Sequence, residues 1–382
     1  MREISRANLS QDYFTNRLDR YYIFSSKELT NHFRKVHDAI CDISYRVALS
    51  DDRTAAFTLE SPIVRGLPDP VLQPERFKEH ASSILEPLIS TTTPPAISVG
   101  VLEKQNTLVY PVAQFDSLLS EGHNISTEKP SLVRILKALS EEPTLRNSHL
   151  VFTAGYFNLD PDISRALIEA VPSEAQIRQL TPSQPDTDIQ PSCTVITASP
   201  WANGFYNSKG ISGMLPAAYT LLSRRFLNNV AKAARSSTIQ LKEWRRGTVG
   251  KPGGWTYHAK GLWLTLPKWD GTSSALPSPS QTRPSIDEET TTRTSLSTPV
   301  GPSLTLIGSS NYTKRSYSLD LEVGALVVTN DETLQRRMME ETEKLQEDAL
   351  VTSSDDLRKA ERRVGLKVRM AMWLVEKLGG AL

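Results

Sequence analysis

Short apolar runs alternate with segments of helical periodicity along most of this 382-residue chain. The runs typical of strands lie at residues 20–24, 97–102, 107–112, 150–153, 194–198, 257–266, 304–307 and 323–329. Helical spacing occurs at residues 130–139, 216–231, 332–348 and 355–378, and a further helix opens at the capping box of Ser25 and Glu28. Because such alternation packs helices on the faces of a sheet, the sequence predicts an α/β fold with a mixed sheet.

The composition excludes several classes of protein. Lys and Arg (44) nearly balance Asp and Glu (43), whereas a nucleic-acid-binding chain usually carries a basic excess, so we expect no nucleic-acid partner. Cys41 and Cys193 form no CxxC pair, which argues against a disulfide framework or a zinc site and favours a reducing compartment. No apolar run approaches the roughly 18 residues that cross a bilayer, so we expect membrane contact to be peripheral.

Two stretches have the composition of loops. Residues 171–192 are rich in Pro, Gln, Ser and Asp, which favours a surface loop. Residues 267–302 are dense in Ser, Thr and Pro and hold few large apolar side chains. Such a segment cannot offset its ordering entropy by burial, so the sequence predicts a disordered insertion at 267–302.

The pattern His258-Ala-Lys260 lies within one of the apolar runs. On a strand, residues two apart face the same side, so these two side chains are expected to project together. An imidazole beside an ammonium group suits a phosphate, because one performs proton or nucleophilic chemistry and the other neutralises charge on oxygen. The pattern therefore indicates chemistry at a phosphate group.

A second polar pattern, Gly308-Ser309-Ser310-Asn311, follows the apolar run at 304–307. Gly308 lets the backbone approach an anion, and Ser309 and Asn311 supply hydrogen-bond donors. Glu322 comes eleven residues after Asn311, where its carboxylate is expected to hold His258 in one tautomer. Each short pattern alone also fits a surface histidine or an Asn-capped turn, but both together at strand ends favour one catalytic site.

HxK followed by GSxN resembles the signature of the phospholipase D superfamily. The Asp that often follows the Lys by five residues is Thr265 here, a departure that leaves the His and Lys in place. Longer strings resemble the eukaryotic CDP-diacylglycerol–glycerol-3-phosphate 3-phosphatidyltransferase family. These strings are TAGYFNL (153–159), ASPWANGFY (198–206), KGISGMLPAAY (209–219), EWRRG (243–247), YHAKGLWL (257–264) and GSSNYTKRSYSLDLE (308–322).

The resemblance implies two pseudo-symmetric mixed-sheet halves, each with its own HxK and GSxN. We expect residues 1–145 to be a remnant of the first half and 146–382 to be the second half. The opening ISRANLS resembles the first GSxN turn, with Asn8 as its asparagine and Arg6 at the expected glycine. No other histidine lies in an HxK pattern, so the sequence predicts a chain that is truncated before the first HxK.

The resemblance also implies a reaction. A phosphatidyl group would pass from CDP-diacylglycerol to glycerol 3-phosphate, giving phosphatidylglycerophosphate and CMP, without metal or cofactor. In this family one histidine attacks phosphorus, and His258 would be the acid that releases CMP and then the base for the acceptor. Lys260 and Asn311 would hold phosphoryl oxygens, and the enzyme would lie on the matrix side of the mitochondrial inner membrane.

Three alternatives remain open at this point. A nuclease or phosphodiesterase of the same superfamily would share the motifs. A catalytically dead lipid-binding scaffold would fit the missing first HxK. A site shared between two chains, each giving one His258, is a further possibility.

Two other features have a functional and a plain interpretation. Asn158, after the strand run at 150–153, either lines the substrate pocket or forms an ordinary turn. The last helix places basic residues beside apolar ones and Trp373, which suits an anionic membrane surface or a helix docked on the sheet.

Overall fold

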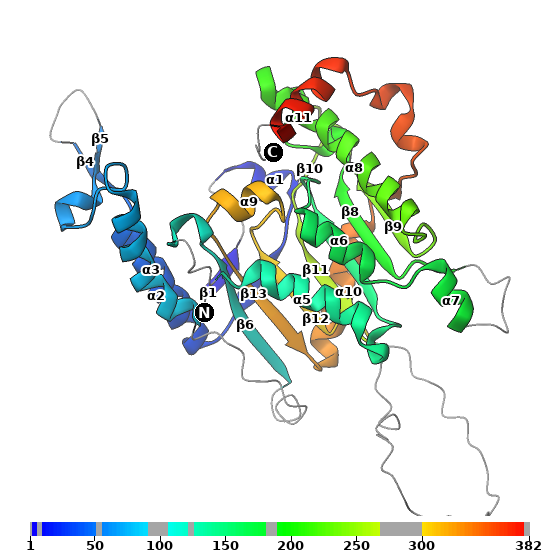
Figure 1. The fold of residues 1–382 in the computed structure, drawn as a ribbon, viewed down its shortest axis with the longest axis horizontal. Helices are drawn as coiled ribbons and strands as arrows, with labels where there is room; N and C mark the ends of the chain where they lie inside the picture. The colour runs from blue at the N-terminus through cyan, green and yellow to red at the C-terminus, as the bar shows by residue number, and fades with distance from the viewer. Residues whose placement is uncertain are drawn as a thin grey trace, which may run out of the picture.

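The computed structural model describes residues 2–5, 10–50, 56–90, 106–120, 126–180, 189–267 and 300–377. Its centre is an eight-stranded sheet of order β14-β9-β8-β7-β11-β12-β13-β6 (Figure 1). The strands are β6 (Thr107–Gln114), β7 (His149–Ala154), β8 (Cys193–Ala198), β9 (Ile239–Trp244), β11 (Lys260–Thr265), β12 (Leu304–Gly308), β13 (Glu322–Thr329) and β14 (Ala349–Val351). The predicted α/β class with a mixed sheet is confirmed.

The sheet is parallel in one part and antiparallel in the other. β7, β8 and β9 run parallel, whereas β11, β12, β13 and β6 pair antiparallel. Every residue of β8, the central parallel strand, is buried, as expected for a strand covered on both faces. Because β6 pairs with β13, the sheet crosses residue 145, the expected boundary between the two halves.

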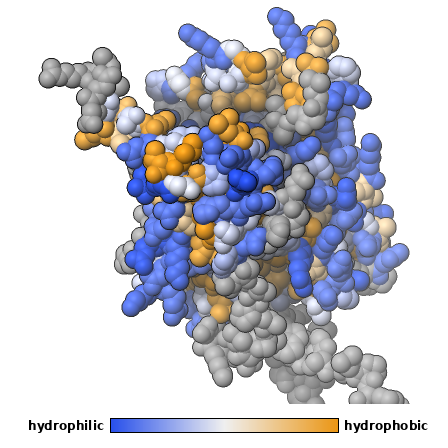
Figure 2. Space-filling model, turned by 60° about the vertical axis from the view of Figure 1, so that its left-hand side comes forward, coloured by the Kyte–Doolittle hydropathy of each residue, from blue (hydrophilic) through white to orange (hydrophobic). Residues whose placement is uncertain are grey.

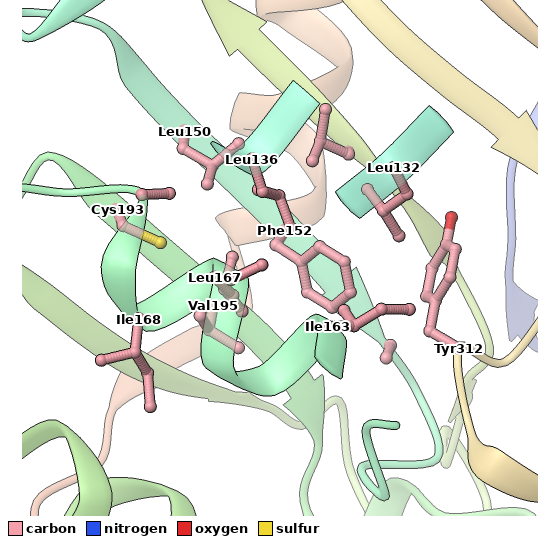
Figure 3. Close-up of a cluster of buried hydrophobic side chains, with 14 of the residues drawn as sticks. Leu132, Leu136, Leu150, Phe152, Ile163, Leu167, Ile168, Cys193, Val195 and Tyr312 are labelled. Carbon is pink, nitrogen blue, oxygen red and sulfur yellow. The ribbon is translucent and has the colours of Figure 1, made fainter. Parts of the chain in front are cut away.

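Helices α5 (Glu128–Glu141), α6 (Pro161–Glu169) and α8 (Leu215–Lys232) cover one face of the sheet (Figure 1). Their apolar sides meet the strands in the largest core cluster. Figure 3 shows Phe152 of β7 between Leu132 and Leu136 of α5 and Ile163 of α6. Each of these side chains is fully buried, which stabilises the fold by about 1.5–3 kcal/mol per side chain.

Helix α10 (Glu332–Gln346) covers the other face, where Met338 and Leu345 pack against Trp244 and Trp263. A separate arm consists of α2 (Lys27–Ile43), the hairpin β4 (Arg46–Leu49) and β5 (Phe57–Glu60), and α3 (Pro74–Ser90). The root of this arm packs on the sheet edge through a third apolar cluster that includes Ala113 and Phe115.

The strand predicted at 257–266 is interrupted at His258. β10 (Thr256–Tyr257) pairs in parallel with β2 (Arg17–Leu18), whereas β11 starts only at Lys260 and joins the large sheet. The backbone N–H of His258 donates to Leu18 O at 2.9 Å. His258 therefore lies where the chain passes from one sheet to the other, because its pairing partner changes there.

Most of the other predicted elements that lie on described residues are confirmed, with three differences in detail. The N-cap of α2 is Ser26, whose side chain accepts from Leu29 N, rather than Ser25. The helix predicted at 355–378 is divided into the turns Asp356–Arg358 and Ala360–Arg362 and the helix α11 (Leu366–Lys377). Part of the predicted loop at 171–192 is the helix α7 (Glu174–Leu180).

Some predictions cannot be compared with the structure. The strand at 97–102 and nearly all of the insertion at 267–302 lie outside the described residues. Among the helices that are described, none combines the length and apolar character of a membrane span.

Candidate active site

The two predicted motifs meet at one end of the large sheet. Lys260 opens β11 opposite Ala154, the last residue of β7. Gly308 closes β12 opposite Gly324 of β13. Because β11 and β12 are antiparallel neighbours, the start of β11 lies beside the end of β12, and Lys260 of HxK lies near Gly308 of GSxN. The antiparallel pairing thus brings together motifs that are about fifty residues apart in sequence.

His258 is held between a carboxylate and an ammonium group. Its Nδ1 lies 2.7 Å from Asp19 Oδ2, and the Asp19 side chain is completely buried. The Nζ of Lys260 lies 2.9 Å from both ring nitrogens and donates to His258 O at 2.8 Å. With Nδ1–H donated to Asp19, the lone pair of the neutral ring is on Nε2.

The environment of His258 favours the neutral imidazole. Burial and the Lys260 ammonium lower the pKa of His258 to about 4, although the hydrogen bond to Asp19 acts in the opposite direction. The ring is therefore unprotonated near neutral pH in the free protein. An unprotonated imidazole held by a carboxylate can act as a base or a nucleophile.

Arg20 fixes the segment that carries Asp19. Its guanidinium donates to Lys260 O at 3.1 Å, Leu306 O at 2.9 Å and Thr305 Oγ1 at 2.9 Å. These bonds join the segment to both β11 and β12. The backbone N–H of Arg20 also donates to Asp19 Oδ1, which orients the carboxylate towards His258.

The residue that follows the GSxN stretch has an unusual backbone conformation. Tyr312 has a φ of 56°, in the left-handed region, and its buried ring packs on Phe152 at 5.1 Å between centroids. Non-glycine residues in this conformation often lie at functional sites. The side-chain oxygen of Asn311 is buried and accepts no hydrogen bond within the described residues, so this group is available to a ligand.

Glu322 has a different contact from the predicted one. The carboxylate that faces His258 is that of Asp19, whereas Glu322 accepts a hydrogen bond from the hydroxyl of Ser309. Because Asp19 occupies the Nδ1 side of the ring, a role of Glu322 in orienting His258 stays a prediction. Glu322 still lies at the site, because it opens β13 beside the GSxN turn.

Aromatic side chains enclose His258. The rings of Tyr13 and Tyr156 each meet the imidazole edge to face, with centroids 5.5 Å apart. Tyr156 in turn stacks on Tyr219 of α8 at 5.8 Å. Arg17 lies over the Tyr13 ring at 4.4 Å, which adds a second cation near the imidazole. The site is therefore an apolar, cationic enclosure that suits a phosphate ester.

The remaining predicted residues have different outcomes. Asn8 lies outside the described residues. Asn158 lines a cavity of about 100 Å³ with Arg225 and Asn229 of α8, and among the described residues that line it there is none from either motif. Its assignment to the phosphate site therefore remains a prediction.

Asp19 is the residue that our sequence analysis missed. A usable signal was present, because Asp19 follows Asn8 by the same eleven residues that separate Glu322 from Asn311. The two turn asparagines thus have acidic residues at equal spacing. The structure pairs the acid of the first turn with the histidine that precedes the second turn.

The chain is similar to curated phosphatidyltransferases over nearly its whole length. It is 36% identical over 375 residues to the CDP-diacylglycerol–glycerol-3-phosphate 3-phosphatidyltransferase of Saccharomyces cerevisiae, covering 98% of this chain. It is 29% identical over 396 residues to the human enzyme of that name, which is described as mitochondrial. The chain is homologous to these phosphatidyltransferases. The resemblance seen in the sequence motifs is thus confirmed.

The coverage of these relatives is partial. The chain spans 63% of the length of the yeast protein and 58% of the human one. No family model matches the chain. Among solved structures, the phosphatidylserine synthase of Haemophilus influenzae matches with a TM-score of 0.50 at 16% identity, covering 96% of this chain and 64% of that one. That likeness shows a shared fold.

Proposed function

We propose that this chain supplies His258 to a site that transfers a phosphatidyl group from CDP-diacylglycerol to glycerol 3-phosphate. The products are phosphatidylglycerophosphate and CMP. The observation that carries the proposal is the buried Asp19–His258–Lys260 arrangement at the meeting point of the two motifs. The names of the relatives support the choice of donor and acceptor.

His258 changes its protonation state during this reaction. Bound CDP-diacylglycerol places negative charge near the ring and favours the imidazolium, which donates its proton to CMP as the histidine of the other HxK takes the phosphatidyl group. The neutral ring that remains, with its lone pair on Nε2, then accepts a proton from the hydroxyl of glycerol 3-phosphate as that oxygen displaces the histidine from phosphorus. Asp19 stabilises this imidazolium without taking its proton.

The neighbouring groups neutralise and position the phosphate. Lys260 lies in contact with the ring, so its ammonium is beside any phosphorus centre that His258 reaches. Asn311 and Gly308 present the amide and the close backbone approach of the GSxN turn. Ser309 is exposed and is oriented by Glu322, which gives this carboxylate a positioning role at the hydroxyl.

We further propose that the site lies between two halves, residues 1–145 and 146–382. Asp19 comes from the first half and His258 from the second, and the equal spacing of the two acidic residues supports a pseudo-symmetric design. Because Asp19 of the same chain already contacts the His258 ring, we disfavour a site that pairs the His258 residues of two chains.

We place the protein on an anionic membrane surface. Helix α11 exposes Leu366, Met370, Trp373 and Leu374, whereas Met372 on its inner side is buried. Lys367, Arg369 and Lys377 belong to the same helix, so apolar, aromatic and cationic groups occur together. Relatives described as mitochondrial support a mitochondrial location, and within it we propose the matrix side of the inner membrane.

The test is CMP release from CDP-diacylglycerol in detergent micelles, with and without glycerol 3-phosphate. We expect a protein that carries both HxK stretches to release CMP, and His258→Ala in that protein to lower the rate by at least about a hundredfold. A His258→Ala variant with full turnover would contradict the role of the imidazole. Cleavage of oligonucleotides in place of CDP-diacylglycerol would instead indicate a phosphodiesterase.

A further inference from the structure

The β4–β5 hairpin has one face made only of apolar side chains. Its antiparallel register pairs Val47 with Leu59 and Leu49 with Phe57. Because side chains alternate along a strand, these four project from one face, and Arg46, Ala48, Thr58 and Glu60 project from the other. The four apolar residues are 70%, 67%, 79% and 62% exposed, respectively.

More apolar side chains continue this surface along the arm. Val64, Val71 and Leu72, in the connection from β5 to α3, are each more than 70% exposed. Figure 2, in which this side of the molecule comes forward, shows apolar residues grouped on the upper part of the arm. Large contiguous apolar patches on a protein surface mark contact sites. We call these seven residues the arm patch.

The arm holds the patch away from the sheet. The described residues of its root contact the sheet edge, through Val36, Leu85 and neighbours packed near Phe115. Figure 1 shows α2 and α3 extending from that edge, with β4 and β5 at the far end. A two-stranded hairpin is marginally stable alone, so an apolar face at such a tip implies a surface that covers it.

The position of α11 identifies the kind of surface. In Figure 1 the β4–β5 tip and α11 both lie towards the upper side of the molecule, at widely separated places. Figure 2 is turned about the vertical axis, and it also shows apolar residues at both upper places. A broad planar surface, such as a membrane, can contact two separate patches on one side of the molecule at the same time. The cations of α11, with Arg65 next to Val64 of the arm patch, complement negative charge on such a plane.

We propose that the arm patch inserts into the interface of an anionic lipid bilayer, with Leu49 and Phe57 entering deepest and α11 resting on the same membrane. This inference deepens the proposed function, which places the substrate in that membrane. The hairpin thereby orients the protein on the surface from which CDP-diacylglycerol is drawn, and its apolar face is buried only in the bound state.

The first test is binding to vesicles of phosphatidylcholine with phosphatidylglycerol, measured by flotation. The variant is Leu49→Asp/Phe57→Asp, and the matched control is Ala48→Asp/Thr58→Asp on the opposite face of the same hairpin. We expect the variant to bind at least about tenfold more weakly than the control, because two large side chains no longer enter lipid. Equal binding of variant, control and wild type would overturn the proposal.

A second measurement covers the case in which the aspartates unfold the hairpin. Leu49→Cys, made with Cys41→Ser, is labelled with an environment-sensitive fluorophore, and Thr58→Cys is the control position. A blue shift with vesicles is expected at position 49 and not at 58. If light scattering instead shows a dimer that the Leu49→Asp/Phe57→Asp variant dissociates, with vesicle binding unchanged, the patch joins two copies and the proposal is wrong.

The two proposals fail separately. Vesicle binding requires no turnover, so a protein with both HxK stretches that binds through Leu49 but releases no CMP contradicts only the proposed reaction. Conversely, CMP release in micelles with unchanged vesicle binding of the Leu49→Asp/Phe57→Asp variant contradicts only the lipid contact.

Discussion

At His258 two opposing effects decide the charge of a catalytic group. Burial and Lys260 favour the neutral ring, and Asp19 favours the imidazolium. The first two dominate in the free protein, so the ring starts as a base. A site that binds an anionic phosphate benefits from this order, because the substrate itself shifts the balance towards the acid form.

The lowered pKa of His258 predicts a stability change with pH. An unfolded histidine binds a proton below its usual pKa of about 6.5, whereas the folded one does so only below about 4. Between these pH values the unfolded state holds more protons than the folded state. The contribution of His258 to the free energy of unfolding is therefore complete above about pH 6.5 and is lost as the pH falls towards 4. We expect a loss of up to roughly 3 kcal/mol from this residue.

Urea unfolding at several pH values, compared between wild type and His258→Gln, isolates this effect. The difference in unfolding free energy between the two proteins is expected to change across this window, because only wild type carries the titrating imidazole. A constant difference would show that His258 keeps an ordinary pKa.

Asp19→Asn is expected to lower kcat/KM for CMP release by about 10²–10⁴. The amide can no longer stabilise the imidazolium, and it can hold the wrong tautomer. The pKa of His258 should fall further, because Asp19 opposes its lowering, so the acidic limb of the pH profile should move to lower pH. Asp38→Asn, on an exposed part of α2, is the matched control. If Asp19 had a purely structural role, the acidic limb of the pH profile for CMP release would not move.

At the scale of elements, the passage from β10 to β11 determines where the site forms. The glycine that follows Lys260 makes this passage possible. Gly261 has a φ of 153°, and a Cβ built there would lie 1.9 Å from Arg20 Nη1. Arg20 can thus cross directly over the β11 backbone and reach Leu306 O on β12.

Gly261→Ala is therefore expected to destabilise the protein by roughly 3 kcal/mol, because the methyl group meets a buried guanidinium and the φ is unfavourable. Gly365→Ala is the control, because a Cβ there meets open space. Thermal or urea unfolding gives the comparison. Equal stability of the two variants would mean that Arg20 moves aside at little cost.

The sequence predicted most elements but not the contacts that place them. Periodicity located the strand at 304–307 and the helix at 216–231 because burial on a sheet face leaves a local pattern. It could not show the break at His258, since the change of pairing partner depends on Arg17–Leu18, far away in the chain. The pairing of Asp19 with His258 was hidden for the same reason.

At the scale of the whole molecule, the segment around Arg20 packs against helix α10, more than 300 residues later in the chain. Arg20 forms an ion pair with Glu341 of α10 at 2.9 Å and lies over the Trp263 ring at 3.8 Å. Glu341 also accepts from Tyr22 and Trp263. Burial opposes its ionisation, but Arg20 and these two donors together hold the pKa of Glu341 below its usual value.

From this ion pair we predict that Glu341→Gln lowers the free energy of unfolding by roughly 3 kcal/mol, because the Arg20 side chain is fully buried and loses its counter-charge. Its neighbour Glu340 is exposed, so Glu340→Gln is a matched control with an expected change within about 0.5 kcal/mol. Urea unfolding measures both. Because Arg20 also positions Asp19, Glu341→Gln should slow CMP release, whereas Glu340→Gln should not. Equal effects of the two variants on stability and rate would show that the opening segment does not depend on α10.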